Sequence, residues 1–362
     1  MNIVVAGAGL AGSLLAQGLS RAGIDVTVFE REPAERDAQG YRIHIDQPGD
    51  LALRELLPPE LYDRVLATAG KRGSGVRVLD PGLRVVQEFL VPETADEAVS
   101  GRHLTVDRST LRRILLTGLT VRHAAPFQRY EVLDTGRVRA WFGDGTEIDA
   151  DLLVGADGTH SRVRAQLLPH AEVVETGQTE IYGRTALTEE ARALTPPAAL
   201  DGFCTVVGDD GRFVPVAAHE FLSGGSDYVM WVVVAPAERF PAGLERADGA
   251  ELRRIAADTV RDWHPNLGAL IRLGDPDSVA RTTIRTAKPL SPWESGPVTL
   301  MGDAAHTMVP AGISAAVALR DAAELCRRIL AEPGALVAAV HDYEGAMLRY
   351  GFEAVAASQR RT

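Results

Sequence analysis

The segment Gly7-Ala8-Gly9-Leu10-Ala11-Gly12 near the N-terminus decides the fold of this chain. It follows a short apolar run, Ile3 to Ala6, and it precedes a helical pattern of leucines. A second strand is expected from Asp25 to Glu30. This order of strand, glycine turn, helix and strand predicts a βαβ unit, which is the context in which a glycine-rich loop binds a dinucleotide.

Each part of this unit has a predicted role. Gly7, Gly9 and Gly12 let the backbone turn tightly and approach a diphosphate, which the N–H groups and the dipole of the following helix attract. Glu30 ends the second strand, where a carboxylate can accept hydrogen bonds from ribose hydroxyls. The unit alone does not separate FAD from NAD.

Two later segments repeat the design of a buried strand that ends in a glycine and an acid. They are Gly155-Ala156-Asp157-Gly158 and Gly302-Asp303-Ala304-Ala305-His306. An aspartate at such a strand end can accept from a ribityl hydroxyl. After the third segment, Pro310 ends the loop and Gly312 opens a long apolar helix, whose positive end would face a flavin pyrimidine. The three segments together favour a flavin dinucleotide.

Composition narrows the class of protein further. The 362 residues hold 38 Lys+Arg and 49 Asp+Glu, a net charge of −11, which argues against nucleic acid as a partner. No basic block suggests an anionic membrane surface, and no apolar run is long enough to span a bilayer. The two cysteines have no metal-site spacing, so we expect no metal and a cytoplasmic location.

The order of strand and helix patterns predicts an α/β chain of two parts. A discontinuous Rossmann-like domain is expected from residues 1–70, 97–170 and 286–362, with the helices of 312–359 packed on it. A second α+β domain for the substrate, built on an antiparallel sheet, is expected from residues 71–96 and 171–285.

The three glycine-and-acid segments and their spacing resemble the class A flavoprotein monooxygenases, a family of aromatic hydroxylases akin to 4-hydroxybenzoate hydroxylase and the tetracycline-degrading monooxygenases. The resemblance covers nearly the full length. It implies that FAD is the cofactor and that NAD(P)H binds transiently as a co-substrate.

The resemblance also implies which residues contact FAD. Carried over position by position, the cofactor contacts are Gly7, Gly9, Gly12, Glu30, Arg31, Arg36, Arg108, Asp157, Gly302, Asp303, Pro310 and Gly312. Arg108 matches the arginine that starts a family helix near the cofactor. Arg36 matches a further flavin-proximal arginine, and a solvated loop arginine is the alternative.

One segment departs from the family pattern. Relatives run through a glycine-rich stretch that ends in Gly-x-Asn before the last long helices begin, whereas this chain has Ser314 and Ala316 at those positions. Those glycines let backbone N–H groups lie against the flavin ring. The departure predicts a changed flavin position or weaker flavin binding.

For the reaction, the resemblance implies that NAD(P)H reduces FAD, that O2 forms a C4a-hydroperoxide, and that an aromatic or polycyclic molecule, with polyketides among the candidates, takes up one oxygen. His44, in the strand pattern Arg42 to Ile45, is the candidate base for a phenol, and a hydrogen-bonded sheet histidine is the alternative. Along Tyr228 to Val234, the alternation places Tyr228 and Met230 on one face, where they line a substrate cavity or belong to a plain core.

Three other functions stay open at this point. A different flavoenzyme, a reductase or a halogenase, fits the same cofactor motifs, although the four tryptophans are isolated. An NAD-dependent dehydrogenase would use only the first glycine loop. A flavin-binding protein without catalysis would follow if the altered 310–316 loop has ended the reaction. The sequence does not fix the oligomeric state.

Overall fold

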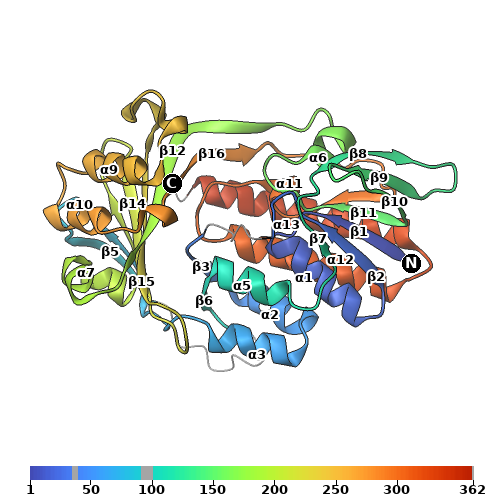
Figure 1. Ribbon diagram of the computed structural model, residues 1–362, viewed down its shortest axis with the longest axis horizontal. Coiled ribbons are helices and arrows are strands. Elements are labelled where there is room, and N and C mark those ends of the chain that lie inside the picture. The colour runs from blue at the N-terminus through green and yellow to red at the C-terminus, as the bar shows by residue number, and fades with distance from the viewer. Residues whose placement is uncertain (35–39, 91–100, 361–362) are drawn as a thin grey trace.

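The computed structural model describes residues 1–34, 40–90 and 101–360. Its elements form two groups that lie side by side: a parallel sheet with its helices, and a larger, mostly antiparallel sheet with helices of its own (Figure 1). The 14-residue strand β12 (Val173–Ala186) runs from one group to the other. The predicted α/β fold class is confirmed.

The parallel sheet carries all three glycine-and-acid segments at one edge. Its strand order is β17-β11-β1-β2-β7, and every neighbouring pair is parallel. Ala6 pairs with Gly155 and Phe29, and Gly155 pairs with Leu300, so the carboxyl ends of four strands lie level. In sheets of this kind ligands bind at that edge. The strands are β1 (Asn2–Ala6), β2 (Asp25–Phe29), β7 (Val121–Arg122), β11 (Leu152–Gly155) and β17 (Val298–Leu300).

Helix α12 is central to the packing around this sheet, because it contacts α1, α2 and α13. We expected it to begin at Gly312, but it begins two residues later. Gly312 has a φ of +75°, which a right-handed helix excludes. The helices are α1 (Leu10–Arg21), α2 (Gln47–Leu56), α3 (Pro59–Ala67), α5 (Arg108–Leu115), α6 (Arg162–Leu167), α11 (Asp303–His306), α12 (Ser314–Ala331) and α13 (Leu336–Gln359).

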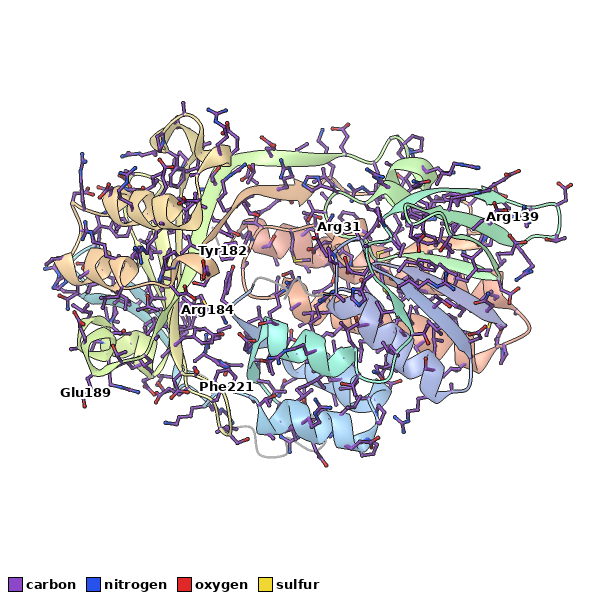
Figure 2. All side chains as sticks on the ribbon, viewed as in Figure 1. Arg31, Arg139, Tyr182, Arg184, Glu189 and Phe221 are labelled. Carbon is purple, nitrogen blue, oxygen red and sulfur yellow. The ribbon has the colours of Figure 1, made fainter. Side chains whose placement is uncertain are left out.

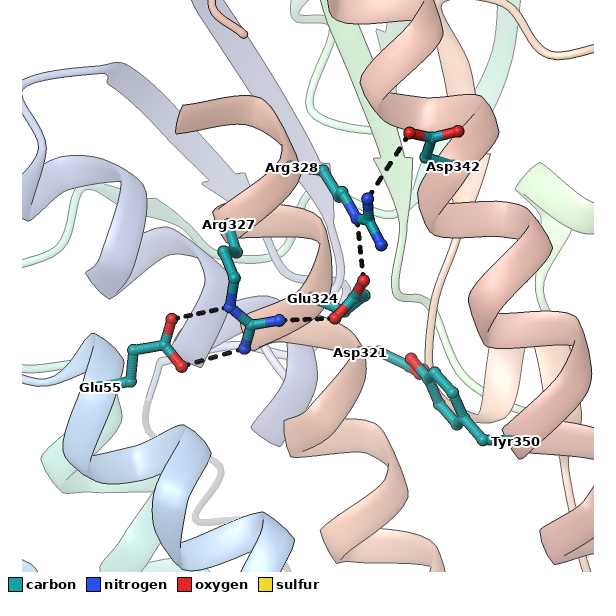
Figure 3. Close-up of polar contacts among 7 residues, drawn as sticks. All are labelled: Glu55, Asp321, Glu324, Arg327, Arg328, Asp342 and Tyr350. Carbon is teal, nitrogen blue, oxygen red and sulfur yellow. Dashed lines mark hydrogen bonds and ion pairs between the residues drawn. The ribbon is translucent and has the colours of Figure 1, made fainter. Parts of the chain in front are cut away.

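Ion pairs tie α12 to its neighbours along one side (Figure 3). Arg327 lies 3.1 Å from Glu55 of α2, and Arg328 lies 3.5 Å from Asp342 of α13. Both arginines also contact Glu324 on α12 itself. Exposed pairs of this kind each stabilise a fold by about 1 kcal/mol or less, so the buried apolar contacts of α12 carry most of its attachment.

Two small antiparallel sheets complete this group. Strand β3 (Arg42–Ile45) pairs with β6 (Leu104–Asp107), which places His44 opposite Thr105. The second is an antiparallel meander of β8 (Phe127–Val132), β9 (Val138–Phe142) and β10 (Glu147–Ala150).

The larger sheet has seven strands in the order β16-β12-β15-β14-β13-β4-β5. It is antiparallel except at one pair, since β13 and β4 run parallel. This pair is the exception to the expected antiparallel sheet. The further strands are β4 (Gly75–Leu79), β5 (Val85–Leu90), β13 (Gly202–Val207), β14 (Phe213–His219), β15 (Tyr228–Pro236) and β16 (Ala280–Ala287).

The two faces of this sheet belong to different hydrophobic clusters. On β15, Val229, Trp231 and Val233 pack into a core with helices α9 and α10. Met230 and its neighbours on the other face pack with Val309, near the third glycine-and-acid segment. The helices of this part are α7 (Glu189–Leu194), α8 (Pro197–Leu200), α9 (Gly249–Thr259) and α10 (Pro265–Arg272), with short 3-10 turns η1 (Ala237–Arg239), η2 (Leu244–Arg246) and η3 (Pro276–Ser278).

The division into two domains at the expected boundaries stays a prediction. Strands β4 and β5 do join the sheet that residues 171–285 mainly build. Among the described residues, no helix combines the length and the apolar character needed to cross a membrane.

Candidate active site

The loops that follow β1, β2 and β11 surround a cleft of about 600 Å³. This volume lies in the range of small-molecule and cofactor sites. The lining residues are Ala6, Gly7, Gly9, Phe29, Glu30, Arg31, Glu32, Arg108, Arg112, Ala125, Pro126, Phe127, Ala156, Asp157, Gly158, His160 and Arg162. The structure therefore brings the first two predicted segments, Arg31 and Arg108 to one place.

The three glycines of the first segment differ in how much space their neighbours leave for a side chain. A Cβ on Gly7 would stand 2.2 Å from the Ala156 carbonyl oxygen, and Gly7 has a φ of +115°. A Cβ on Gly12 would stand 2.2 Å from the Gly7 oxygen. Around Gly9, in contrast, nothing lies within 4 Å of that position. Gly7 and Gly12 are thus required by the turn itself, whereas Gly9 keeps open space at the cleft.

The start of helix α1 is arranged to receive an anion. Gly9 is its N-cap residue, and no side chain caps it. The first N–H groups of a helix have no partner within the helix and carry its positive dipole end. With Gly9 open beside them, these groups fit the diphosphate of a dinucleotide.

Glu30 is 9 % exposed, and hydrogen bonds fix both of its oxygens. Oε2 accepts from the Ala8 N–H at 3.0 Å, and Oε1 accepts from the Glu32 N–H at 3.0 Å. The guanidinium of Arg112 lies 3.3 Å from Oε2 and also donates to the Ala8 carbonyl at 2.8 Å. Glu30 is therefore held rigidly at the cleft wall, with the remaining lone pairs of its carboxylate available to a hydroxyl.

Arg112 was missed by the sequence reasoning. It lies four residues after Arg108 on α5, and residues at this spacing share one face of a helix. Both arginines line the cleft. This spacing from Arg108 is the signal in the sequence by which Arg112 could have been found.

Asp157 lines the cleft and also builds the turn around it. Its Oδ2 accepts from the Arg162 N–H at 2.8 Å, and its Oδ1 accepts from the Ser161 hydroxyl. These bonds hold the start of α6. The carboxylate is thereby positioned by its own loop, as Glu30 is.

The third segment is organised by Asp321, which is fully buried on α12. Asp321 accepts from the Gly302 N–H at 2.7 Å, contacts His306 Nε2 at 2.7 Å and accepts from the Tyr350 hydroxyl at 2.7 Å. Gly302 has a φ of +58°, a conformation that side chains other than glycine rarely adopt. His306 thus orders the loop.

Asp303 is not among the residues that line the cleft. Asp303 reaches the surface, yet protein atoms packed around its carboxyl displace water from it, and this desolvation raises its pKa. The charge of Arg108 reaches both Asp303 and the cleft. Of the three acids, the structure places Glu30 and Asp157 in one cleft.

The departure at Ser314 and Ala316 has a packing cause. Ala316 is 2 % exposed, and its Cα stands 3.1 Å from where a Cβ on Gly49 would be. Helix α12 therefore approaches the start of α2 very closely, and a larger residue than alanine at position 316 does not fit there. Pro310 and Gly312 are both exposed in the loop before the helix.

His44 is engaged with its neighbours and does not line the cleft. Its Nε2 lies 3.1 Å from His103 Nδ1, and a backbone hydrogen bond joins the ring to Gly312. Burial, followed by the neighbouring His103, lowers the pKa of His44 to about 4. Such a weak base is poorly matched to the removal of a phenol proton at neutral pH.

Tyr228 and Met230 lie on the sheet face that looks toward the cleft side of the molecule, and both are buried. The Tyr228 hydroxyl donates to Asp107 Oδ2 at 3.0 Å. Asp107 caps helix α5 by accepting from the Thr110 N–H, and it pairs with Arg184 at 3.5 Å. Tyr228 thus links the large sheet to the helix that carries Arg108. Arg36 lies outside the described residues.

Residues 1–336 match the family model described as an FAD binding domain. This chain belongs to the class A FAD-dependent monooxygenase family. FAD is the cofactor of that family, and the open space at Gly9, the uncapped start of α1 and the fixed carboxylate of Glu30 fit its ADP part.

Solved structures of relatives extend over the whole chain. A candidate FAD-containing monooxygenase from Photorhabdus luminescens is 31% identical, with a TM-score of 0.86 and coverage of 99% of this chain and 97% of the other. HpxO of Klebsiella pneumoniae, solved with FAD and uric acid, is 26% identical, with a TM-score of 0.83 and coverage of 100% and 87%.

Among curated relatives, the dual O-methyltransferase/FAD-dependent monooxygenase elcB of Phaeosphaeria nodorum is 32% identical over an alignment of 378 positions, gaps included, which covers 90% of this chain and 40% of that protein. The chain thus spans less than half of the length of the first curated relatives that it matches.

Proposed function

We propose that this chain is an FAD-dependent monooxygenase that uses NAD(P)H and O2 to hydroxylate an aromatic or polycyclic small molecule. The observation that carries the proposal is the cleft at the level carboxyl ends of β1, β2 and β11, with a diphosphate cradle and a fixed carboxylate in a chain of this family. HpxO, solved with uric acid, and the fungal dual enzymes support a small organic substrate by analogy.

In this proposal the residues of the chain bind and orient FAD and shield it from water. Gly9 and the first N–H groups of α1 hold the diphosphate, and Glu30 accepts from the ribose. Asp157, Arg31, Arg108 and the third segment, with Gly302, Asp303, Pro310 and Gly312, contact the remainder of FAD. When bound, FAD supplies the redox and oxygen-transfer chemistry, which no side chain of a protein provides alone.

The substrate would lie between the cofactor and the inner face of the large sheet. That face is mostly apolar, so it excludes water from the reacting atoms. Its strands are rigid and buried, which suits the orientation of a ring against a flavin. This placement supports the proposed division of the chain into a cofactor domain and a substrate domain.

The experiment combines cofactor content, turnover and isotope transfer. The purified protein is expected to bind FAD and turn yellow, and a panel of phenols, quinones and polycyclic aromatics is expected to stimulate NAD(P)H oxidation. Mass spectrometry under labelled dioxygen should then find one labelled oxygen in the product. Product without label contradicts a monooxygenase and favours a different flavin oxidoreductase. Reductant use that releases only peroxide shows uncoupling or a compound that is not the substrate. A protein that binds FAD but stays inert with every compound favours a binding protein.

A further inference from the structure

Strand β12 places a buried acid on the inner face of the large sheet. Side chains alternate along a strand, so Glu180, Tyr182 and Arg184 share one face, while Ile181 and Thr185 belong to the outer core. Figure 2 shows Tyr182 and Arg184 on the side of the sheet that is turned toward the other half of the molecule. Glu180 is only 5 % exposed.

Glu180 lacks the partners that a buried carboxylate normally has. Its Oε2 makes no hydrogen bond, and within the described part of the chain no cation pairs with it. Its cross-strand neighbours are Val234 and Thr282. Leaving such an oxygen unpaired in the interior costs about 1–3 kcal/mol or more. A residue retained at this cost calls for a ligand that completes its hydrogen bonding.

The surroundings of Glu180 are those of a site for a ring. Tyr41 and Tyr182 both lie within electrostatic reach of the acid, and their rings meet edge to face at 5.0 Å between centroids. Both tyrosines are half-buried rather than sealed in the core. The cluster around them is apolar and contains Val234 and Ile284.

This group borders the cofactor cleft through one residue. The charge of Arg108 reaches Tyr41 and Tyr182, and Arg108 itself lines the cleft. The loop after the third segment contributes Val309, which packs in the same cluster as the sheet face. Glu180 and the two tyrosines therefore lie where the inner sheet face meets the cofactor loops.

We propose that Glu180 binds the hydrogen-bond donor of the substrate, a ring hydroxyl or a ring N–H, beside Tyr41 and Tyr182. The inference rests on the proposed monooxygenase function and narrows its substrate class to aromatic rings that carry such a donor. A donor in this position satisfies Oε2 and fixes which ring carbon faces the cofactor.

The acid–base properties of Glu180 suit this role better than those of His44. Burial raises the pKa of Glu180 to about 7, which matches a group that exchanges a proton near neutral pH. The O–H or N–H proton moves to Oε2, the carboxyl becomes neutral, and the bonding pair stays on the substrate and enriches its ring. The proton returns to the same substituent when the product leaves.

The test compares Glu180→Gln with Glu175→Gln in the FAD-loaded protein. Glu175 lies on the same strand, but it is exposed and paired with Arg285, so it serves as the matched control. The probes are the phenol or N–H heteroaromatic with the highest turnover in the labelled-dioxygen screen, or 4-hydroxybenzaldehyde if none turns over, and the O-methyl or N-methyl derivative of that compound. Binding is followed by the change in flavin absorbance, so it does not depend on turnover.

We expect Glu180→Gln to keep its FAD spectrum and to bind the probe roughly 10- to 100-fold more weakly, with a smaller loss for the methylated derivative. The acid limb of the kcat/KM profile near pH 7 should also disappear, whereas Glu175→Gln should behave as the wild type. Equal binding of probe and derivative by the wild type, or unchanged binding by Glu180→Gln, overturns the inference. If the probe is discriminated but never oxygenated, the inference stands and the proposed function fails.

Discussion

At the scale of single residues, the cofactor cradle separates glycines that shape the turn from a glycine that leaves room. Gly7 combines a positive φ with a Cβ position 2.2 Å from a carbonyl oxygen, whereas Gly9 has open space and an ordinary φ of −75°. The same substitution, glycine to alanine, should therefore impair the stability of the fold at Gly7 and the binding of FAD at Gly9.

Gly7→Ala is expected to destabilise the fold by more than about 2 kcal/mol, because the backbone must move to remove the contact. Gly9→Ala should change stability by less than about 1 kcal/mol, yet weaken FAD binding at least about tenfold. Thermal unfolding of the FAD-free proteins and FAD titration measure the two effects. FAD affinity of Gly9→Ala at the wild-type level would show that the diphosphate does not approach there.

Arg112 offers a second test at this scale. Arg112→Gln removes the cation that holds Glu30 and the Ala8 carbonyl, so FAD affinity should fall by about 1–3 kcal/mol in binding free energy. Arg113→Gln is the matched control, because Arg113 is the neighbouring residue, is exposed, and its side chain donates to Thr110 on its own helix. Equal affinities in the two variants would refute a role for Arg112 in holding the cleft wall.

The sequence predicted those site residues whose positions depend on nearby residues in the chain, and it missed those whose surroundings come from distant segments. Gly7, Glu30 and Asp157 follow strands whose ends lie level in any parallel sheet, so the pattern alone was enough to bring them together. Glu180 could not be predicted in this way. Its alternation is hidden in β12 by polar residues around Gly177, and its lack of a partner depends on Tyr41, Val234 and Thr282, which arrive from distant segments.

At the scale of elements, the close approach of α12 to α2 explains the departure from the family loop. Ala316→Asn restores the family residue but places a longer side chain against Gly49, so it should destabilise the protein by about 1–3 kcal/mol. Ala331→Asn, at the exposed end of the same helix, controls for the lower helix propensity of asparagine. Chemical denaturation of both variants measures the difference, and a neutral Ala316→Asn would mean that the two helices have room to separate.

At the scale of the whole molecule, buried ionisable groups make stability depend on pH. Burial alone lowers the pKa of His306, but its contact with Asp321 outweighs burial, and the pKa lies above its usual 6.5. A raised histidine pKa stabilises the fold fully below pH 6.5, and this contribution is lost as pH rises through the folded-state pKa. Burial raises the pKa of Glu180 from 4.5 to about 7. Ionisation of this carboxyl therefore lowers the stability of the fold as the pH rises between these two values.

Both groups therefore lower stability as the pH rises from about 5 toward alkaline conditions. His44 and His219 oppose this decline below pH 6.5, because burial lowers the pKa of each to about 4. Relative to the wild type, Glu180→Gln should reduce the decline in the free energy of unfolding below about pH 7 by roughly 2–3 kcal/mol at most. Replacing His306 by Gln should flatten it above pH 6.5, at a lower overall stability. Differential scanning calorimetry across pH 5–9 measures the profiles, and parallel profiles for all three proteins would contradict this assignment.

The two faces of the seven-stranded sheet have a consequence for how such a protein can diverge. Trp231 and Val233 belong to a core of their own, and Met230 and Val232 belong to a separate cluster beside the cofactor loops. Met230 and Val232 can therefore be exchanged without disturbing the outer core, whereas Tyr228 must stay because it bonds the cap of α5. A library that randomises only those positions should yield many variants that still load flavin but accept new molecules, which makes this surface the natural place to redirect the chemistry.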